Sequence, residues 1–195
     1  VQKVNNAIAN VQSKPINLEY RVQDASGNWR WFYDYSINSE RRDEGMVITG
    51  IATEITQQKQ IEQLTQARLR LSEYALNHNL HEIMQKALDE AEALTDSRIG
   101  FFHLLEPDQR ILTLQVWSTN TIQNMCNADG QGMHYPVNKA GVWADCIRER
   151  KPVIHNDYAQ LAYKRGMPKG HATVSRQLVV PIMRDNLIVA IMGVG

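Results

Sequence analysis

The sequence predicts an α+β protein in which a long helix separates two mixed segments. Residues 18–23 and 29–35 alternate between apolar and polar side chains, the period-two pattern of half-buried strands. Residues 54–79 contain neither glycine nor proline and are rich in Gln, Glu, Arg, Leu and Ala, which favours a helix. A new alternation of helices and strands begins at residue 80. We therefore expect an antiparallel sheet, a linker helix, and a second domain with a central antiparallel sheet flanked by helices.

The first segment predicts a three-stranded antiparallel sheet. Residues 2–13 suggest a short helix that ends before Pro15. Strands are then expected at residues 18–23, 29–35 and 46–52. The turn at 24–27 offers Gly27 for a positive φ, and a charged loop is expected at 39–45. Such a sheet leaves an apolar, aromatic face in water unless something covers it, and we expect the cover to come from a preceding part of the protein.

The helix expected over residues 54–79 carries one apolar stripe. Its members are Ile61, Leu64, Leu71 and Ala75. Their spacing places them on one helix face, although the period slips at Leu69, so the pattern is a short, imperfect heptad. A stripe of this kind can pair with a second copy of itself. We therefore expect a homodimer through this helix.

The second segment predicts a sheet with helices on both sides. A helix with a wide apolar stripe is expected over 80–94. Strands are expected at 100–105, 111–117, 133–137, 152–154, 177–183 and 187–194. A helix is also expected at 140–150, a helical turn within 119–132, a long loop at 155–175 and a hairpin turn at 184–186. Acidic pairs such as Asp89 and Glu90 are expected on a solvated helix face, where they do no acid–base work.

Composition limits the classes of function. The formal net charge is zero, which gives no pull toward nucleic acid or anionic membrane. The two cysteines fit a reducing, cytoplasmic compartment and form no disulfide framework. No apolar run approaches the roughly 20 residues that span a bilayer. Because the chain starts at Val1 and stops within an apolar strand at Gly195, we expect a fragment of a longer protein, whose other parts could include a membrane anchor.

The first segment resembles the C-terminal part of a PAS domain. The matching residues are Glu19-Tyr20-Arg21, Ser26-Gly27, Trp29-Arg30-Trp31, Gly50-Ile51 and Glu54-Ile55-Thr56. PAS domains commonly end in an Asp-Ile-Thr triplet that leads into a signalling helix, and Glu54 takes the place of the Asp here. The resemblance implies that this acid pairs with a basic residue. It places the PAS part at residues 1–53 and the signalling helix at 54–79.

The second segment resembles a GAF domain, at residues 80–195 and without the family's final helix. The matching stretches are Gly141-Val142-Trp143, residues 148–154, residues 155–158, Gly170-His171, Arg176, residues 178–182 and residues 191–195. PAS and GAF modules joined by a helix are similar to the sensory part of bacterial signalling proteins. The resemblance therefore implies a two-component phosphorelay, with a histidine kinase or diguanylate cyclase as the output domain of the parent protein.

Six residues are candidates for a small-ligand site in the second domain: Trp117, Trp143, Asp157, Tyr158, His171 and Arg176. Long loops in compact domains tend to be functional, and the loop at 155–175 carries three of the six. The aromatic rings would form an apolar floor, and Arg176 would suit an anion. The competing interpretation is that the aromatic residues are core and that Asp157 caps backbone groups.

The sequence offers no clear catalytic or metal site. Six histidines are present, but none has the spacing of a zinc motif. Cys146 lies on the inward side of the 140–150 helix as a small apolar residue. Asn127 follows Cys126, whereas the attachment Cys of bilin-binding GAF domains is typically followed by His, so no covalent bilin is expected. Phosphate-loop and kinase patterns are absent as well.

These observations favour a sensory region without catalytic activity. We expect a small ligand of unknown identity in the GAF domain and a signal relayed through the dimeric helix to an output domain. One alternative is a ligand-free dimerisation or scaffold module. A more distant alternative is an enzyme resembling GAF-type free methionine sulfoxide reductases, which would use Cys126 or Cys146.

Overall fold

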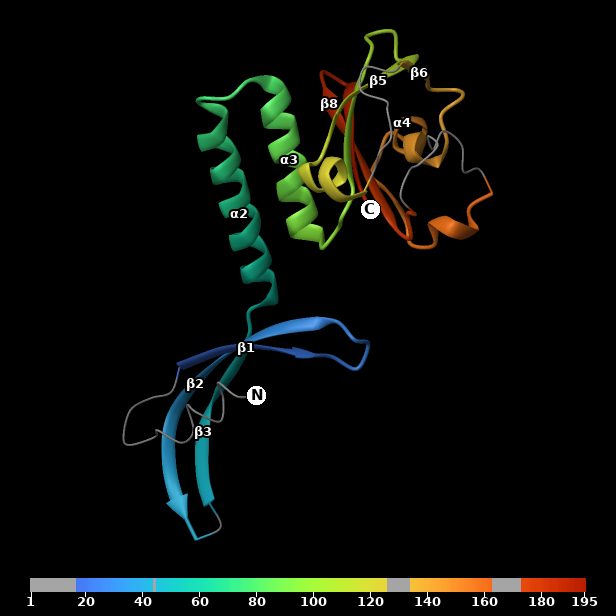
Figure 1. Ribbon diagram of the computed structural model, residues 1–195. Coiled ribbons are helices and arrows are strands. Elements are labelled where there is room, and N and C mark those ends of the chain that lie inside the picture. The colour runs from blue at the N-terminus through green and yellow to red at the C-terminus, as the bar shows by residue number, and fades with distance from the viewer. Residues whose placement is uncertain (1–16, 44, 126–133, 163–172) are drawn as a thin grey trace. The chain divides into compact units, whose positions relative to one another are not determined.

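The computed structural model describes residues 17–43, 45–125, 134–162 and 173–195 (Figure 1). The chain divides into two compact units, residues 1–66 and residues 67–195. The helix predicted at residues 2–13 lies outside the described part. No helix within the described residues is both long and apolar enough to cross a membrane.

The first unit contains a three-stranded antiparallel sheet. Its strands are β1 (Asn17–Gln23), β2 (Trp29–Arg42) and β3 (Gly45–Glu54), in the order β1-β2-β3. All three predicted strands are present. The predicted charged loop at 39–45 is wrong, because Glu40, Arg41 and Arg42 continue β2 and pair with β3. Charged side chains fit a strand that faces water on both sides, and Arg42 and Glu40 pair with each other at 3.1 Å.

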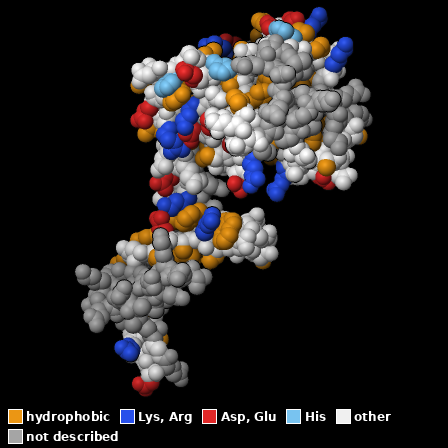
Figure 2. Space-filling model, in the orientation of Figure 1, with side chains coloured by type: hydrophobic (Ala, Val, Ile, Leu, Met, Phe, Trp, Pro, Cys, Tyr) orange, Lys and Arg blue, Asp and Glu red, His pale blue; other side chains and the backbone are white. Residues whose placement is uncertain are grey.

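Apolar side chains lie at the surface of this sheet (Figure 2). Trp29 is 50% exposed, Ile51 is 57% exposed and Ile37 is 63% exposed. Tyr20 and Phe32 stack across β1 and β2 with their ring centroids 6.2 Å apart. The sheet therefore carries the exposed apolar and aromatic surface that the alternation of its residues predicted.

Hydrogen bonds fix the start of helix α2 (Thr56–Ala75) to this sheet. The backbone N–H of Ile55 donates to the carbonyl of Trp31 at 2.8 Å, and the N–H of Trp31 donates to the Thr56 hydroxyl at 2.9 Å. Arg30 donates to Glu54 at 3.2 Å. Glu54 therefore pairs with a basic residue, as the resemblance to PAS domains implied.

The second unit begins within α2 and continues into helix α3 (Leu80–Thr95). The predicted single helix over 54–79 is too long at both ends. Glu54 still belongs to β3, and Asn79 starts the next helix as its N-cap. The Asn79 side chain accepts from the N–H of Glu82 at 3.1 Å, and Glu82 accepts from the N–H of Asn79 at 2.9 Å. This capping box begins α3 and so ends the continuity with α2.

A six-stranded antiparallel sheet forms the centre of the second unit. Its strands are β4 (Gly100–Leu105), β5 (Ile111–Trp117), β6 (His134–Pro136), β7 (Val153–His155), β8 (Gln177–Arg184) and β9 (Leu187–Val194), in the order β6-β5-β4-β9-β8-β7. The last two strands form the predicted hairpin. Its turn residues Asp185 and Asn186 have φ values of 48° and 63°, the left-handed backbone that a two-residue hairpin turn requires.

Helices cover both faces of this sheet (Figure 1). On one face, α3 packs Met84 and Leu88 against Phe102, Val116 and Ala190. On the other face lies helix α4 (Asp145–Glu149), preceded by a 3₁₀ turn at Val142–Ala144. The core of that face consists of Leu105, Leu112, Ala140, Trp143, Ala144, Cys146, Ile147, Val153, Val179, Ile188 and Ile191. The helix predicted over 140–150 is therefore too long, because its first part forms a tighter turn and Arg150 adopts the left-handed conformation at φ 53°.

Candidate functional site

Four side chains form a contiguous aromatic cluster on the α4 face of the sheet: Phe101, His103, Trp117 and Trp143. Phe101 and His103 lie two residues apart on β4 and so point to the same face. Phe101 forms edge-to-face pairs with Trp117 and Trp143, with centroid distances of 6.4 and 6.2 Å. His103 stacks on Trp143 at 4.9 Å. The cluster joins β4, β5 and the turn before α4.

His103 is the polar member of this cluster. It is 5% exposed, and burial lowers its pKa to about 3. The imidazole is therefore neutral at neutral pH, with one nitrogen able to donate and the other able to accept. The sequence analysis missed His103 as a site residue. The available signal was its position on an alternating strand, two residues after Phe101.

Gly193 on β9 makes room for the cluster. It pairs with Phe101 across the β4–β9 ladder. A Cβ atom at this position would lie 2.2 Å from the tip of the Phe101 ring. The glycine therefore permits the ring of Phe101 to lie against the strand, where it reaches both tryptophans.

Gln177 adds a polar group on the same sheet face. Val179, two residues further along β8, belongs to the core that contains Trp143, so Gln177 points to that side as well. Gln177 is 6% exposed. Its Oε1 is enclosed and accepts no hydrogen bond from the described residues, although other atoms of Gln177 border a cavity on the surface. A buried acceptor of this kind needs a donor from elsewhere.

The structure brings together only some of the six predicted site residues. Trp117 and Trp143 meet through Phe101 in the aromatic cluster. Tyr158 is 3% exposed, and burial raises its pKa. Asp157 is exposed and begins the 3₁₀ turn at Tyr158–Gln160, where its carbonyl accepts from the N–H of Gln160 at 3.2 Å. His171 lies outside the described residues.

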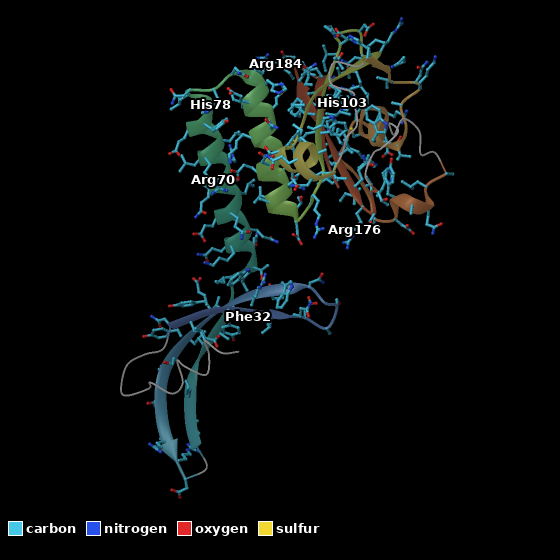
Figure 3. All side chains as sticks on the ribbon, viewed as in Figure 1. Phe32, Arg70, His78, His103, Arg176 and Arg184 are labelled. Atoms are coloured by element: carbon cyan, nitrogen blue, oxygen red, sulfur yellow. The ribbon has the colours of Figure 1, made fainter. Side chains whose placement is uncertain are left out.

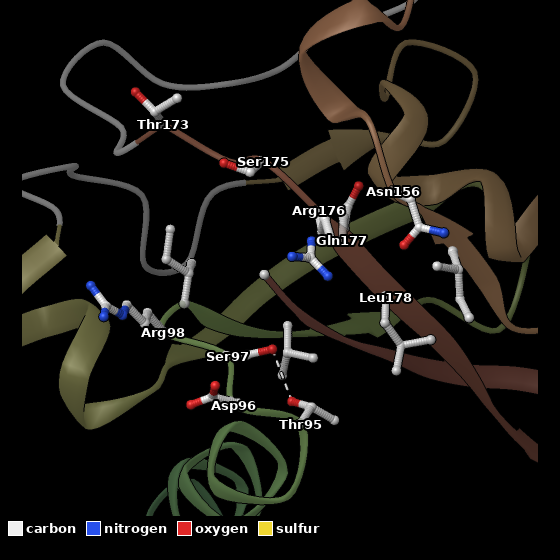
Figure 4. A pocket seen from close by; sticks show the side chains of 14 residues that line it. Thr95, Asp96, Ser97, Arg98, Asn156, Thr173, Ser175, Arg176, Gln177 and Leu178 are labelled. Carbon is white, nitrogen blue, oxygen red and sulfur yellow. Dashed lines mark hydrogen bonds between the residues drawn. The ribbon is translucent and has the colours of Figure 1, made fainter. Parts of the chain in front are cut away.

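Arg176 lines the surface cavity that Gln177 also borders, of about 760 Å³ (Figure 4). This cavity is bordered by the turn after α3, by β7, by the start of β8 and by the end of β9. Figure 4 shows the Arg176 guanidinium near the turn that carries Ser97, whose hydroxyl accepts from Thr95 at 2.9 Å. Figure 3 shows Arg176 well apart from His103. Arg176 is therefore not part of the aromatic cluster.

Glu90 of α3 does not lie on a solvated face, so the expectation for the pair Asp89 and Glu90 is wrong for this residue, and Glu92 is buried as well. Glu90 and Glu92 are only 8% and 7% exposed. Glu90 pairs with Arg70 of α2 at 2.6 Å and with Lys86 at 3.0 Å, and the Arg70 hydrogen bonds lower its pKa to about 2. Burial raises the pKa of Glu92, which accepts from the Ser118 hydroxyl. These carboxylates therefore connect α3 to its neighbours.

The chemistry of Cys146 is that of an apolar core residue. Its thiol is fully buried, and burial raises its pKa to about 12. The nucleophilic form is the thiolate, which such a pKa suppresses at neutral pH. Cys126 lies outside the described residues. Among the residues that the structure describes, no three His, Cys, Asp or Glu side chains form a group that could hold a metal ion.

The second unit is an α+β domain with helices on both faces of its sheet, and the comparison with protein families identifies this fold. Residues 77–195 match the model of the GAF domain, and the chain belongs to this family. The methyl sulfide methyltransferase-associated sensor of Methanosarcina acetivorans is 33% identical over 156 residues. The alignment covers 76% of this chain and 15% of that sensor, so the chain spans a small part of its relative.

Solved structures show the same fold. The GAF domain of a phosphoenolpyruvate-protein phosphotransferase from Acinetobacter superposes with a TM-score of 0.54 at 12% identity, over 70% of this chain and 75% of that one. A free methionine-R-sulfoxide reductase from Neisseria meningitidis, solved with its substrate, gives 0.52 at 12% identity, over 69% and 71% of the two chains. At such identities the likeness concerns the fold alone. The GAF domain and the homologous sensor together indicate a sensory or regulatory module.

Proposed function

We propose that this chain is the sensory region of a larger signal-transduction protein and that its GAF domain binds a small ligand beside the aromatic cluster. The observation that carries the proposal is the enclosed Oε1 of Gln177, which has no donor among the described residues. An unpaired buried acceptor costs about 1–3 kcal/mol. A ligand N–H or O–H group at this position would remove that cost.

The ligand that fits these groups is uncharged, with a flat or apolar part and a hydrogen-bond donor. Trp117 and Phe101 are only partly buried, so their rings can still contact a ligand. His103 is neutral and adds no positive charge. An anion would instead suit Arg176, which lies apart from the aromatic cluster, in the surface cavity that Gln177 also borders. The aromatic cluster and Gln177 are therefore the primary site of the proposal.

We further propose that occupancy biases the packing of α4 and the long loop against the sheet, and that α2 carries this bias onward as a dimeric helix. A ligand shifts such an equilibrium only through its different affinity for the two states. Ile61 and Leu64 support the dimer, because they are 57% and 50% exposed on the predicted stripe. In this proposal residues 1–53 are the remnant of a PAS domain and residues 54–79 are the signalling linker. The parent protein is a histidine kinase or diguanylate cyclase whose sensory region lies in the cytoplasm.

Native mass spectrometry of the freshly purified chain, before and after denaturation, tests the ligand. The expected result is a small molecule that is released on unfolding. Gln177→Met should reduce its occupancy, whereas Gln160→Met, at an exposed position, should leave occupancy unchanged. Equal occupancy in all three proteins would remove Gln177 from the site. An empty wild-type protein would contradict ligand binding.

The second candidate is a ligand-free dimerisation or scaffold module. It is favoured by the burial of Trp143 and Tyr158, which are 8% and 3% exposed and so behave as core. An empty protein that sediments only as a dimer would support this function. The enzymatic alternative has less support, since Cys146 is buried with a raised pKa and the sensor homology points to a regulatory role.

A further inference from the structure

Acidic residues of α3 hold two different elements of the second unit. Glu90 binds the guanidinium of Arg70 on α2, with N···O distances of 3.0 and 2.6 Å. Asp89, directly before it, binds the turn that follows β5. Glu92, two residues after Glu90 on the helix, binds the same turn after β5. Neighbouring side chains of one rigid helix thus contact α2 on one side and the β5 turn on the other.

The contact with the β5 turn is dense and mostly enclosed. The N–H and the hydroxyl of Thr119 donate to the two carboxylate oxygens of Asp89, both at 2.8 Å. The Ser118 hydroxyl donates to Glu92 and lies 2.6 Å from the hydroxyl of Thr121. Ser118 and Thr121 are fully buried. We call the five residues Asp89, Glu92, Ser118, Thr119 and Thr121 the α3 clasp.

The clasp adjoins the aromatic cluster through the chain itself. Trp117 is the last residue of β5 and directly precedes Ser118. Consecutive Cα atoms are held about 3.8 Å apart, so a shift of the clasp changes the backbone of Trp117. The Trp117 and Phe101 rings form an edge-to-face pair at a centroid distance of 6.4 Å. A π-helical turn follows at Thr121–Met125, a geometry that frequently marks functional positions.

We propose that the α3 clasp couples the pairing of α2 with α3, at Arg70 and Glu90, to the position of the Trp117 ring. The clasp has two states, one in which Asp89 and Glu92 hold the turn and one in which the turn is released. Loss of the Arg70 pairing moves α3 and shifts the balance between them. This inference deepens the relay in the proposed function and rests on it for its biological role. The coupling itself is testable without any ligand.

Fluorine NMR of the protein labelled with 5-fluorotryptophan measures this coupling. The chain has four tryptophans, and Trp117→Phe assigns the resonance of Trp117. Arg70→Met should shift that resonance. Lys151→Met, which removes the exposed ion pair between Lys151 and Glu149, should not. The proposal would be overturned if the Trp117 resonance did not shift in Arg70→Met, or if it shifted equally in Lys151→Met.

The second arm asks whether the effect passes through the clasp. Asp89→Ala removes both hydrogen bonds to Thr119, and in this background the shift caused by Arg70→Met should be lost. Thr119→Val removes only the hydroxyl bond, so it should weaken the shift and provides a milder variant if Asp89→Ala unfolds. A merely structural clasp would leave the effects of the variants additive. An undiminished shift in folded Asp89→Ala or Thr119→Val protein would therefore refute the coupling, whereas failed ligand binding would leave this result unaffected.

Discussion

Arg70 of α2, labelled in Figure 3, donates two hydrogen bonds to the carboxylate of Glu90 on α3. The Glu90 side chain is 10% exposed, whereas that of Arg70 is 51% exposed. Paired geometry of this kind is the strongest class of side-chain hydrogen bond, and its loss leaves a largely buried carboxylate with Lys86 alone. The pair therefore fastens the second half of α2 to α3.

Replacing Arg70 by Met should lower the urea midpoint of unfolding, because it removes two hydrogen bonds to the Glu90 carboxylate. Lys86→Met should cost about 0.5 kcal/mol, because Lys86 contributes one contact along the same helix. Urea unfolding at neutral pH measures both. A larger loss for Lys86→Met than for Arg70→Met would contradict the assignment of Arg70 as the main partner.

Glu90 and Glu92 should make the stability of the protein depend on pH in opposite directions. The Arg70 hydrogen bonds lower the pKa of Glu90 from 4.5 to about 2, so its stabilisation is complete above the unfolded value and is lost as pH falls toward 2. Burial raises the pKa of Glu92. Its contribution to stability is therefore present at pH values below the pKa of the unfolded state and is lost as pH rises through the pKa of the folded state. Melting curves between pH 2 and pH 8 should show Glu90→Gln destabilised at neutral pH. They should also show that Glu92→Gln flattens the decline toward higher pH. A Glu92→Gln profile parallel to wild type would contradict the buried carboxyl.

Alternation along the chain was sufficient to predict the sheets. Strands β4 and β5 occur at the predicted residues, and the hairpin of β8 and β9 follows from two apolar runs around a short polar turn. The errors arose where tertiary contacts override local signals. Glu40 and Arg42 are charged yet extend a strand. The helix at 140–150 shortens because its first residues form a 3₁₀ turn.

The site was less predictable than the fold, for a physical reason. Trp117 and Trp143 were identified as candidates, but the aromatic cluster also contains Phe101 and His103, which the sequence separates from Trp143 by about 40 residues. Outside hairpins such as β8–β9, sequence spacing does not say which strands and turns become neighbours. Arg176 was grouped with the aromatics by its position near one strand, yet it lies apart from the aromatic cluster, in the surface cavity that Gln177 borders. The burial of Glu90 and Glu92 likewise depends on partners far along the chain.

Leu64→Asp should convert the proposed dimer to monomer, as observed by sedimentation velocity. Leu64 is 50% exposed on the stripe of Ile61, and a charge there would have to be buried in a helix pair. Leu71 is less suitable because it is half-buried within its own unit. Leu69→Asp is the matched control, since Leu69 is 58% exposed and lies about 140° around the helix from Leu64. Dimers that survive Leu64→Asp would place the interface elsewhere.

Gly193→Ala should destabilise the protein by about 1–3 kcal/mol, the usual cost of overpacking. The added methyl group would lie 2.2 Å from Phe101 and so displace its ring from the two tryptophans. Tryptophan fluorescence should change together with the urea midpoint. Phe101→Leu in the same chain removes the atoms that clash, so the double variant should be more stable than the sum of the single effects. Strict additivity would show that Gly193 does not position Phe101.

Cys146 should resist alkylation in the folded protein and react only after unfolding. Its side chain is fully buried, and its pKa is raised to about 12, so both access and thiolate are lacking at pH 8. Iodoacetamide labelling followed by peptide mass spectrometry distinguishes this thiol from Cys126. Cys146→Ala, which leaves the second thiol unchanged, identifies the slow-reacting site. Reductase-like chemistry requires a reactive thiolate, and the buried position of Cys146 disfavours that form. Rapid modification of Cys146 in the native protein would therefore support the reductase-like alternative.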